Sequence, residues 1–183
     1  MNKIFIVLIF SVLSYGQVKT LDLKFPQKRE IPQNFKNAIV LQIDELKRLF
    51  PDQVDSIKNY SVETILNNID NTKEFADLWK AEFWIAFHYH EIIPQLIYRV
   101  TNKKEIGLVN SADLIILDRI ENGDLRSYGH GFIVDDDLFT IAGRANRLLT
   151  IISGEKMGSV SMKSTPEDLA KLQKKWIDWL IKL

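Results

Sequence analysis

Residues 126–137, RSYGHGFIVDDD, place a tyrosine, a histidine between two glycines and three consecutive aspartates in one short stretch. The imidazole of His130 titrates close to neutral pH, so it can act as a general acid or base. A carboxylate from Asp135, Asp136 or Asp137 can orient that imidazole or share a metal ion with it, and the Tyr128 hydroxyl can donate a proton. These groups would suit the site of a hydrolase, with His130, Asp135 and Asp137 as the candidate catalytic residues.

The same residues also have a structural interpretation. Gly129 and Gly131 suit a backbone that needs positive φ angles around His130. Aspartates that precede LFTIAGRAN suit the start of a helix, one as the N-cap and the others against the helix dipole. We favour this interpretation, which predicts a helix over 137–153. It leaves the Tyr128–His130 pair without a structural explanation.

His88 and His90 are the other two histidines of the chain. A metal site on a helix needs ligands four positions apart, whereas residues two positions apart point about 200° away from each other. The two histidines could share an ion only if the helix unwound near Pro94. The chain also has no G-x-S-x-G turn, no phosphate-binding glycine loop and no H-E-x-x-H motif. We therefore predict no metal site and no cofactor.

Arg144 and Arg147 are three positions apart and so are neighbours on one face of a helix. They can bind an anionic group or form ion pairs with a nearby aspartate, and we favour the ion pairs. The aspartates considered as partners are Asp113, Asp118 and Asp137. The candidate binding residues of the chain are Tyr128, His130, Arg144 and Arg147.

The composition excludes several classes of protein. The 24 basic and 24 acidic residues balance without a basic run, which argues against a nucleic-acid partner and against a polybasic membrane anchor. The absence of cysteine excludes disulfides, thiolate zinc sites and a cysteine nucleophile. The fold must therefore be stabilised by its apolar core, for which 183 residues are sufficient.

The first residues have the layout of a secretory signal peptide. Lys3 precedes an apolar run over 4–13, and Ser14 and Gly16 place small residues at −3 and −1 of a cut before Gln17. The run is shorter than the roughly 20 apolar residues that span a bilayer. We expect residues 1–16 to be removed, no membrane span to remain, and the mature protein to reach the periplasm or the extracellular space.

The remaining pattern predicts an extended arm over 17–34 and a single all-α domain over 35–183. Apolar residues recur at spacings of three and four in each expected helix. The expected helices cover 35–50, 62–69, a third segment that opens at Asn71 and Glu74 and is kinked or broken by Pro94, 111–120, 137–153 and 165–183. They form about three irregular helix pairs (35–69, 73–100 and 111–153) and a closing helix, arranged as a HEAT-like array or an α-bundle.

Several capping residues support these boundaries. Ser61 and Thr165 are expected N-caps, the second followed by Pro166 at the first helical position. Gly123 and Gly154 suit the left-handed position that follows a helix.

The C-terminal half resembles the terminal unit of HEAT-like helical-repeat proteins. Such units carry an apolar helix, an I-[ST]-G-x-x-[FM]-G turn and a tryptophan-rich closing helix. The matching residues are Ile152, Ser153, Gly154, Met157, Gly158, Trp176 and Trp179. The segment from about Glu91 to Leu183 is also similar to secreted bacterial proteins of similar length that have no assigned activity. We expect the two tryptophans to pack in the core rather than to bind carbohydrate.

The resemblance implies a scaffold or a protein-binding surface, because stacked helix pairs present concave faces. Our leading hypothesis is a non-enzymatic, exported helical module that binds another protein. The alternative is a hydrolase that acts on envelope material, with its site in the 126–137 stretch.

Overall fold

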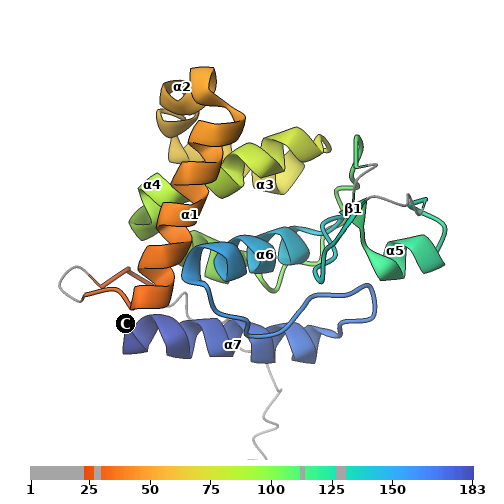
Figure 1. The fold of residues 1–183 in the computed structure, drawn as a ribbon. Coiled ribbons are helices and arrows are strands. Elements are labelled where there is room, and N and C mark those ends of the chain that lie inside the picture. Colours follow the sequence, from red (N-terminus) through yellow and green to blue (C-terminus); the bar gives the residue numbers. More distant parts are fainter. Residues whose placement is uncertain (1–22, 27–29, 112–113, 127–130) are drawn as a thin grey trace, which may run out of the picture.

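The fold is all-α, as the sequence predicts. The computed structural model describes residues 23–26, 30–111, 114–126 and 131–183. Within these residues it contains helices joined by irregular segments and one sheet of two short strands (Figure 1). The elements are α1 (Gln33–Leu49), a 3₁₀ turn (Pro51–Gln53), α2 (Val54–Lys58), α3 (Val62–Asn71), α4 (Phe75–Arg99), β1 (Leu114–Ile115), α5 (Leu117–Glu121), β2 (Phe132–Ile133), α6 (Ile141–Ser153) and α7 (Pro166–Lys182).

Helices α1 and α3 follow local signals closely. Pro51 ends α1 as expected, and the Ser61 hydroxyl accepts a hydrogen bond from Thr64 N–H at the start of α3. The short helix α2 was not predicted. The expectation that Asn71 opens the third helix is wrong, because Asn71 is the last residue of α3 and Glu74 is the residue before α4.

Helix α4 is the centre of the fold and packs against α1, α2, α3, α6 and α7. Its kink lies at His88 (φ −127°, ψ 24°) rather than at Pro94, which is buried inside the second part of the helix. At the kink the His88 ring stacks on Trp84, with centroids 4.3 Å apart, and its Nε2 lies 2.8 Å from the Lys58 carbonyl oxygen. These contacts tie the bend of α4 to the end of α2.

The predicted helix over 111–120 is wrong at 114–116. Residues 114–115 form β1, which pairs in parallel with β2, and only 117–121 is helical. Leu114 and Ile116 are buried while Ile115 between them is only partly so, which is the two-residue alternation of a strand. A run of leucine and isoleucine is compatible with the periodicity of a helix and with that of a strand. Here Leu114 and Ile116 are buried in a small second core.

Helices α6 and α7 complete the domain. The α6 helix begins at Ile141 with Thr140 as its N-cap, so the prediction that it begins at Asp137 is wrong. It ends at Gly154 (φ +69°) as predicted. The α7 helix has the expected Thr165 cap and Pro166 start, with Asp168 completing a capping box.

The apolar core has two parts. The main cluster joins α1, α3, α4, α6 and α7 and includes Phe35, Trp84 and the fully buried Trp176, which confirms Trp176 as a core residue. From the N-terminal arm, Phe25 packs its ring edge-on against Phe35 and Tyr89. The second cluster lies beneath β1 and β2 and consists of Leu78, Leu108, Leu114, Ile116, Val134, Leu138 and Phe139. It supports the end of the molecule that carries β1 and α5, on the right in Figure 1, away from α1 and the C-terminus.

Over the described residues, no helix combines the length and the apolar character that a membrane span requires.

Candidate functional site

The three consecutive aspartates have three different structural partners. Asp135 is exposed and forms an ion pair with Lys156 at 2.5 Å. Asp136 and Asp137 are buried and accept hydrogen bonds from inside the protein. None of them is the N-cap of α6, which corrects that expectation. Tyr128 and His130 lie outside the described residues.

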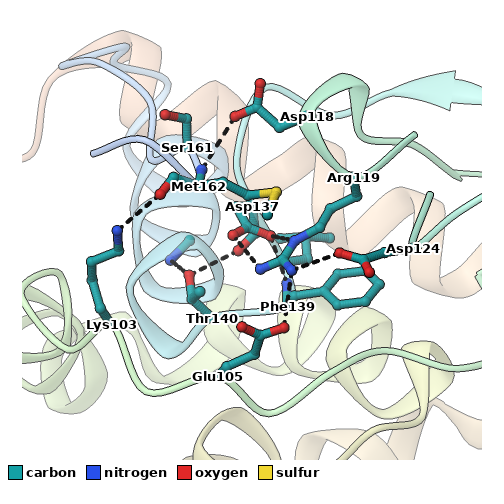
Figure 2. A network of polar contacts seen from close by, with 12 residues as sticks. Lys103, Glu105, Asp118, Arg119, Asp124, Asp137, Phe139, Thr140, Ser161 and Met162 are labelled. Atoms are coloured by element: carbon teal, nitrogen blue, oxygen red, sulfur yellow. Dashed lines mark hydrogen bonds and ion pairs between the residues drawn. The ribbon is translucent and has the colours of Figure 1, made fainter. Parts of the chain in front are cut away.

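Asp137 belongs to an ion network centred on Arg119 of α5. The Arg119 guanidinium donates two hydrogen bonds to the Asp137 carboxylate, at 2.8 and 2.7 Å, and further bonds to Glu105 and Asp124 (Figure 2). It also lies over the Phe139 ring, 4.5 Å from the centroid. Burial alone would lower the pKa of Arg119, but its carboxylate partners outweigh that effect and raise the pKa. Arg119 is therefore a permanent cation that fixes α5 to the segment before α6.

Asp136 holds the 158–160 segment against α6. One of its oxygens accepts hydrogen bonds from Asn146 Nδ2 and from the Val160 amide, each at 2.8 Å. Asn146 in turn donates to the Gly158 carbonyl and accepts from Trp176 Nε1. Burial raises the pKa of Asp136 to about 6, against the effect of these hydrogen bonds.

Arg144 is a buried cation whose guanidinium is bonded to the backbone of the protein. Its guanidinium donates to four backbone carbonyls and forms neither of the expected ion pairs that lie within the described residues, with Asp118 or with Asp137, while Asp113 lies outside them. The acceptors are the carbonyls of Leu138, Ile69, Thr72 and Gly107. Two of these lie at the C-terminal end of α3, where a cation is also favoured by the helix dipole. Burial lowers the pKa of Arg144 to about 10, so it remains charged at neutral pH.

Arg147 does form an ion pair, but with a residue that the sequence did not suggest. Its Nε lies 2.7 Å from the carboxylate of Glu82 on α4. The Glu82 side chain is buried. Burial raises the pKa of Glu82, and the charge of Arg147 opposes that rise. The guanidinium also lies 5.9 Å from the Phe132 ring centroid, so Arg147 connects α4 to β2.

The described surface has a groove at the same end of the molecule. One pocket, of about 220 Å³, is lined by residues that follow the two parallel strands together with the 159–161 segment. A second pocket, of about 370 Å³, lies beside α5 and the 162–163 segment. The two share Asp118, and we call them together the α5 groove. Its lining residues are Ile116, Leu117, Asp118, Glu121, Asn122, Ile133, Val134, Asp135, Asp137, Ser159, Val160, Ser161, Met162 and Lys163.

Large apolar side chains are exposed along the α5 groove. Leu117 is 58% exposed and Ile133 is 65% exposed, and both line the first pocket. Phe132, next to Ile133 on β2, is also exposed, and its ring leans toward Phe75 of α4. The groove therefore combines apolar contact area with the carboxylates of α5.

The frame beneath the groove is held by several polar contacts. The Asp118 carboxylate accepts a hydrogen bond from the Met162 amide at 3.2 Å, and the Lys103 ammonium donates to the Met162 carbonyl (Figure 2). The same ammonium also donates to the carbonyl of Ser164. The Val160 carbonyl accepts the Asp137 amide at 2.8 Å. These contacts connect the wall formed by 159–163 to α5, to Asp137 and to the segment that follows α4.

The remaining histidines have packing roles. His88 is bonded at the α4 kink, and the His90 ring packs on Phe25 with centroids 4.7 Å apart. Among the described residues there is no group of three histidine, aspartate or glutamate side chains placed to hold a metal ion.

The comparisons with known proteins found no matching family model, no similar curated protein and no similar solved structure. The likeness to HEAT-like repeats accordingly stays a prediction.

Sequence reasoning missed the residues that build the α5 groove. None of Leu117, Arg119, Glu121 and Ile133 was singled out from the sequence. The sequence pattern around these residues gives little indication of the pocket. The pocket depends on the parallel pairing of β1 with β2, and parallel strands are not joined by a hairpin turn that could be recognised in the sequence.

Proposed function

We propose that this chain is an exported, non-enzymatic module that binds another protein, in the periplasm or outside the cell, through the α5 groove. The observation that carries the proposal is the position of Leu117 and Ile133, both exposed, on the lining of one pocket. Exposed apolar side chains gathered beside polar groups are typical of protein contact surfaces.

The polar contacts beneath the groove support the same function. Arg119, Asp137 and Lys103 hold the walls of the groove through bonds within the protein. A surface that is already ordered loses less conformational entropy when a partner binds, so more of the contact energy contributes to affinity.

The partners of the aspartates favour binding over catalysis. Asp137 is engaged by Arg119 through both carboxylate oxygens, and Asp136 accepts two hydrogen bonds at one oxygen. These bonds connect loops to helices and give both residues a structural role. The hydrolase alternative depends on His130, and no contact of a described residue specifically favours it.

Export is the second part of the proposal and has its own test. The charged, apolar and small-residue order of 1–16 supports it. We expect the protein expressed in its native host to begin at Gln17 and to leave the cytoplasm, which mass spectrometry of fractionated cells measures. A cytoplasmic protein that retains residues 1–16 would contradict export and leave the binding surface untouched.

Binding is tested by capture with a matched pair of variants. The mature chain is immobilised and exposed to extract of the native cell envelope, and captured proteins are identified by mass spectrometry. Leu117→Asp places a charge in the groove, whereas Leu41→Asp changes an equally exposed leucine on α1 (58% for both). We expect one partner that binds wild type and Leu41→Asp but is lost with Leu117→Asp. Equal capture by all three proteins would exclude the groove as the binding surface.

A further inference from the structure

We infer that the α5 groove receives an extended segment of the partner protein that carries an aliphatic side chain two positions away from a basic one. This inference rests on the proposed function and specifies the chemistry that the groove recognises.

The aliphatic part of the segment is assigned to the pocket between the strand ends. Apolar side chains from three separate segments of the chain line it, namely Ile116 and Leu117, Ile133 and Val134, and Val160. Its volume of about 220 Å³ is below the usual range for drug-sized ligands, roughly 300–1,000 Å³, and is large enough for one branched side chain. Burial of such a side chain contributes favourably to binding in proportion to the apolar area removed from water.

The basic part is assigned to the pocket beside α5. Of the four acids that line the groove, Asp137 is neutralised by Arg119 and Asp135 by Lys156. Asp118 and Glu121 form no ion pair with any described residue, and they are three positions apart on α5, so they share a face. Lys163 is the single base among the described lining residues, so two carboxylates face one ammonium. This imbalance favours a cationic side chain over an anionic one.

The two pockets suit an extended chain because they adjoin at Asp118. In an extended segment, side chains two positions apart point to the same face and are separated by about 6.6 Å. One such pair can enter the two pockets together. Within the described sheet β2 has β1 as its neighbour on one edge, which leaves its other edge for the backbone of an added strand.

The test uses a random heptapeptide library displayed on phage as the probe, selected on the mature protein. We expect the enriched peptides to carry valine, isoleucine or leucine two positions from lysine or arginine. A labelled peptide from this set should bind at least tenfold more weakly to Ile133→Asp and to Glu121→Lys than to wild type, by fluorescence anisotropy. Both substituted side chains are exposed, so the variants should fold, and circular dichroism checks this.

Two control variants distinguish a loss of binding at the groove from a general effect of adding charge to the surface. Leu41→Asp on α1 and Glu63→Lys on α3 make the same chemical changes at exposed positions outside the groove, and peptide affinity should stay within twofold of wild type. Enrichment of acidic peptides, absence of enrichment, or equal binding by the groove and control variants would each overturn the inference. If peptides fail while the envelope partner is still lost with Leu117→Asp, the proposed function stands and only the extended basic segment is wrong.

Discussion

Asp135, Asp136 and Asp137 are consecutive in the chain, and each of them contacts different partners. Asp135 pairs with a surface lysine, Asp136 binds an asparagine and a backbone amide, and Asp137 neutralises the buried Arg119. The difference follows from the direction of each side chain out of an irregular segment, which places one in water and two in the interior. A run of identical residues therefore carries little information about which of them is chemically available.

Asp136 should make the stability of the protein depend on pH. Its pKa rises from 3.8 to about 6 on folding, so the folded state binds a proton more tightly than the unfolded state does. The stabilising effect of that proton is complete below about pH 4 and is lost as the pH rises through about 6. The difference of about two pKa units corresponds to roughly 3 kcal/mol.

The Asp136→Asn variant tests this effect. The asparagine oxygen can accept the same bonds from Asn146 and Val160, but the side chain does not titrate. Urea unfolding of both proteins between pH 4 and pH 7 gives the difference in unfolding free energy at each pH. We expect wild type to lose stability relative to the variant as the pH rises through this range. A constant difference would show that Asp136 has the same pKa in both states.

Arg144 should be far more important for stability than an exposed arginine. The guanidinium of Arg144 donates one hydrogen bond to each of four buried or partly buried carbonyls, and Arg144→Leu removes all of these bonds. Removal of a buried hydrogen-bonding partner costs about 1–3 kcal/mol for each group left unsatisfied, so we expect a loss of at least about 3 kcal/mol in urea unfolding. Arg48→Leu on α1, whose ion pair is exposed, should change stability by less than about 1 kcal/mol. Similar losses for both variants would contradict the role assigned to Arg144.

At the scale of elements, caps were predictable and non-local pairings were not. Ser61, Thr165 and Gly154 mark helix ends through contacts within a few residues, so their positions in the sequence are sufficient. By contrast, β1 depends on a partner strand 18 residues further along, and Arg144 depends on carbonyls up to 75 residues away. Such contacts cannot be read from residue spacing, which is why the strand at 114–115 and the carbonyl partners of Arg144 were not predicted.

The first turn of α6 contains a close backbone approach that Gly143 makes possible. A Cβ atom at this position would lie 2.0 Å from the carbonyl oxygen of Asp137. That carbonyl also accepts hydrogen bonds from the amide and the hydroxyl of Thr140, so it is not free to move away. Gly143 thus fixes the segment of Asp136 and Asp137 against the start of α6.

The Gly143→Ala variant tests this close approach through the sign of the change in unfolding free energy. In an ordinary helix this change stabilises by up to about 1 kcal/mol, because alanine has the higher helix propensity. Here the added methyl group overlaps a held backbone oxygen, and we expect a destabilisation of about 1–3 kcal/mol or more in urea unfolding. A more stable variant would mean that the segment before α6 does not pack as described.

At the scale of the whole molecule, the main core and the α5 groove share Val160, which is buried in the main cluster and also lines the groove. Helices α1, α3, α4, α6 and α7 share one large apolar cluster, whereas β1, β2 and α5 rest on a second, smaller one. The Arg119 network fixes α5 to the segment before α6, and the hydrogen bonds of Asp136 connect that segment to Asn146 of α6 and to Val160 of the main cluster.

The most direct test of the central claim is photo-crosslinking in living cells of the native host. The photoreactive amino acid p-benzoylphenylalanine replaces Leu117 in one protein and the equally exposed Leu41 in another. We predict one discrete crosslinked product of higher mass at position 117 and none at position 41, because the partner occupies the α5 groove. No product at 117, or the same product at both positions, would contradict the claim that this groove is where the protein binds its partner.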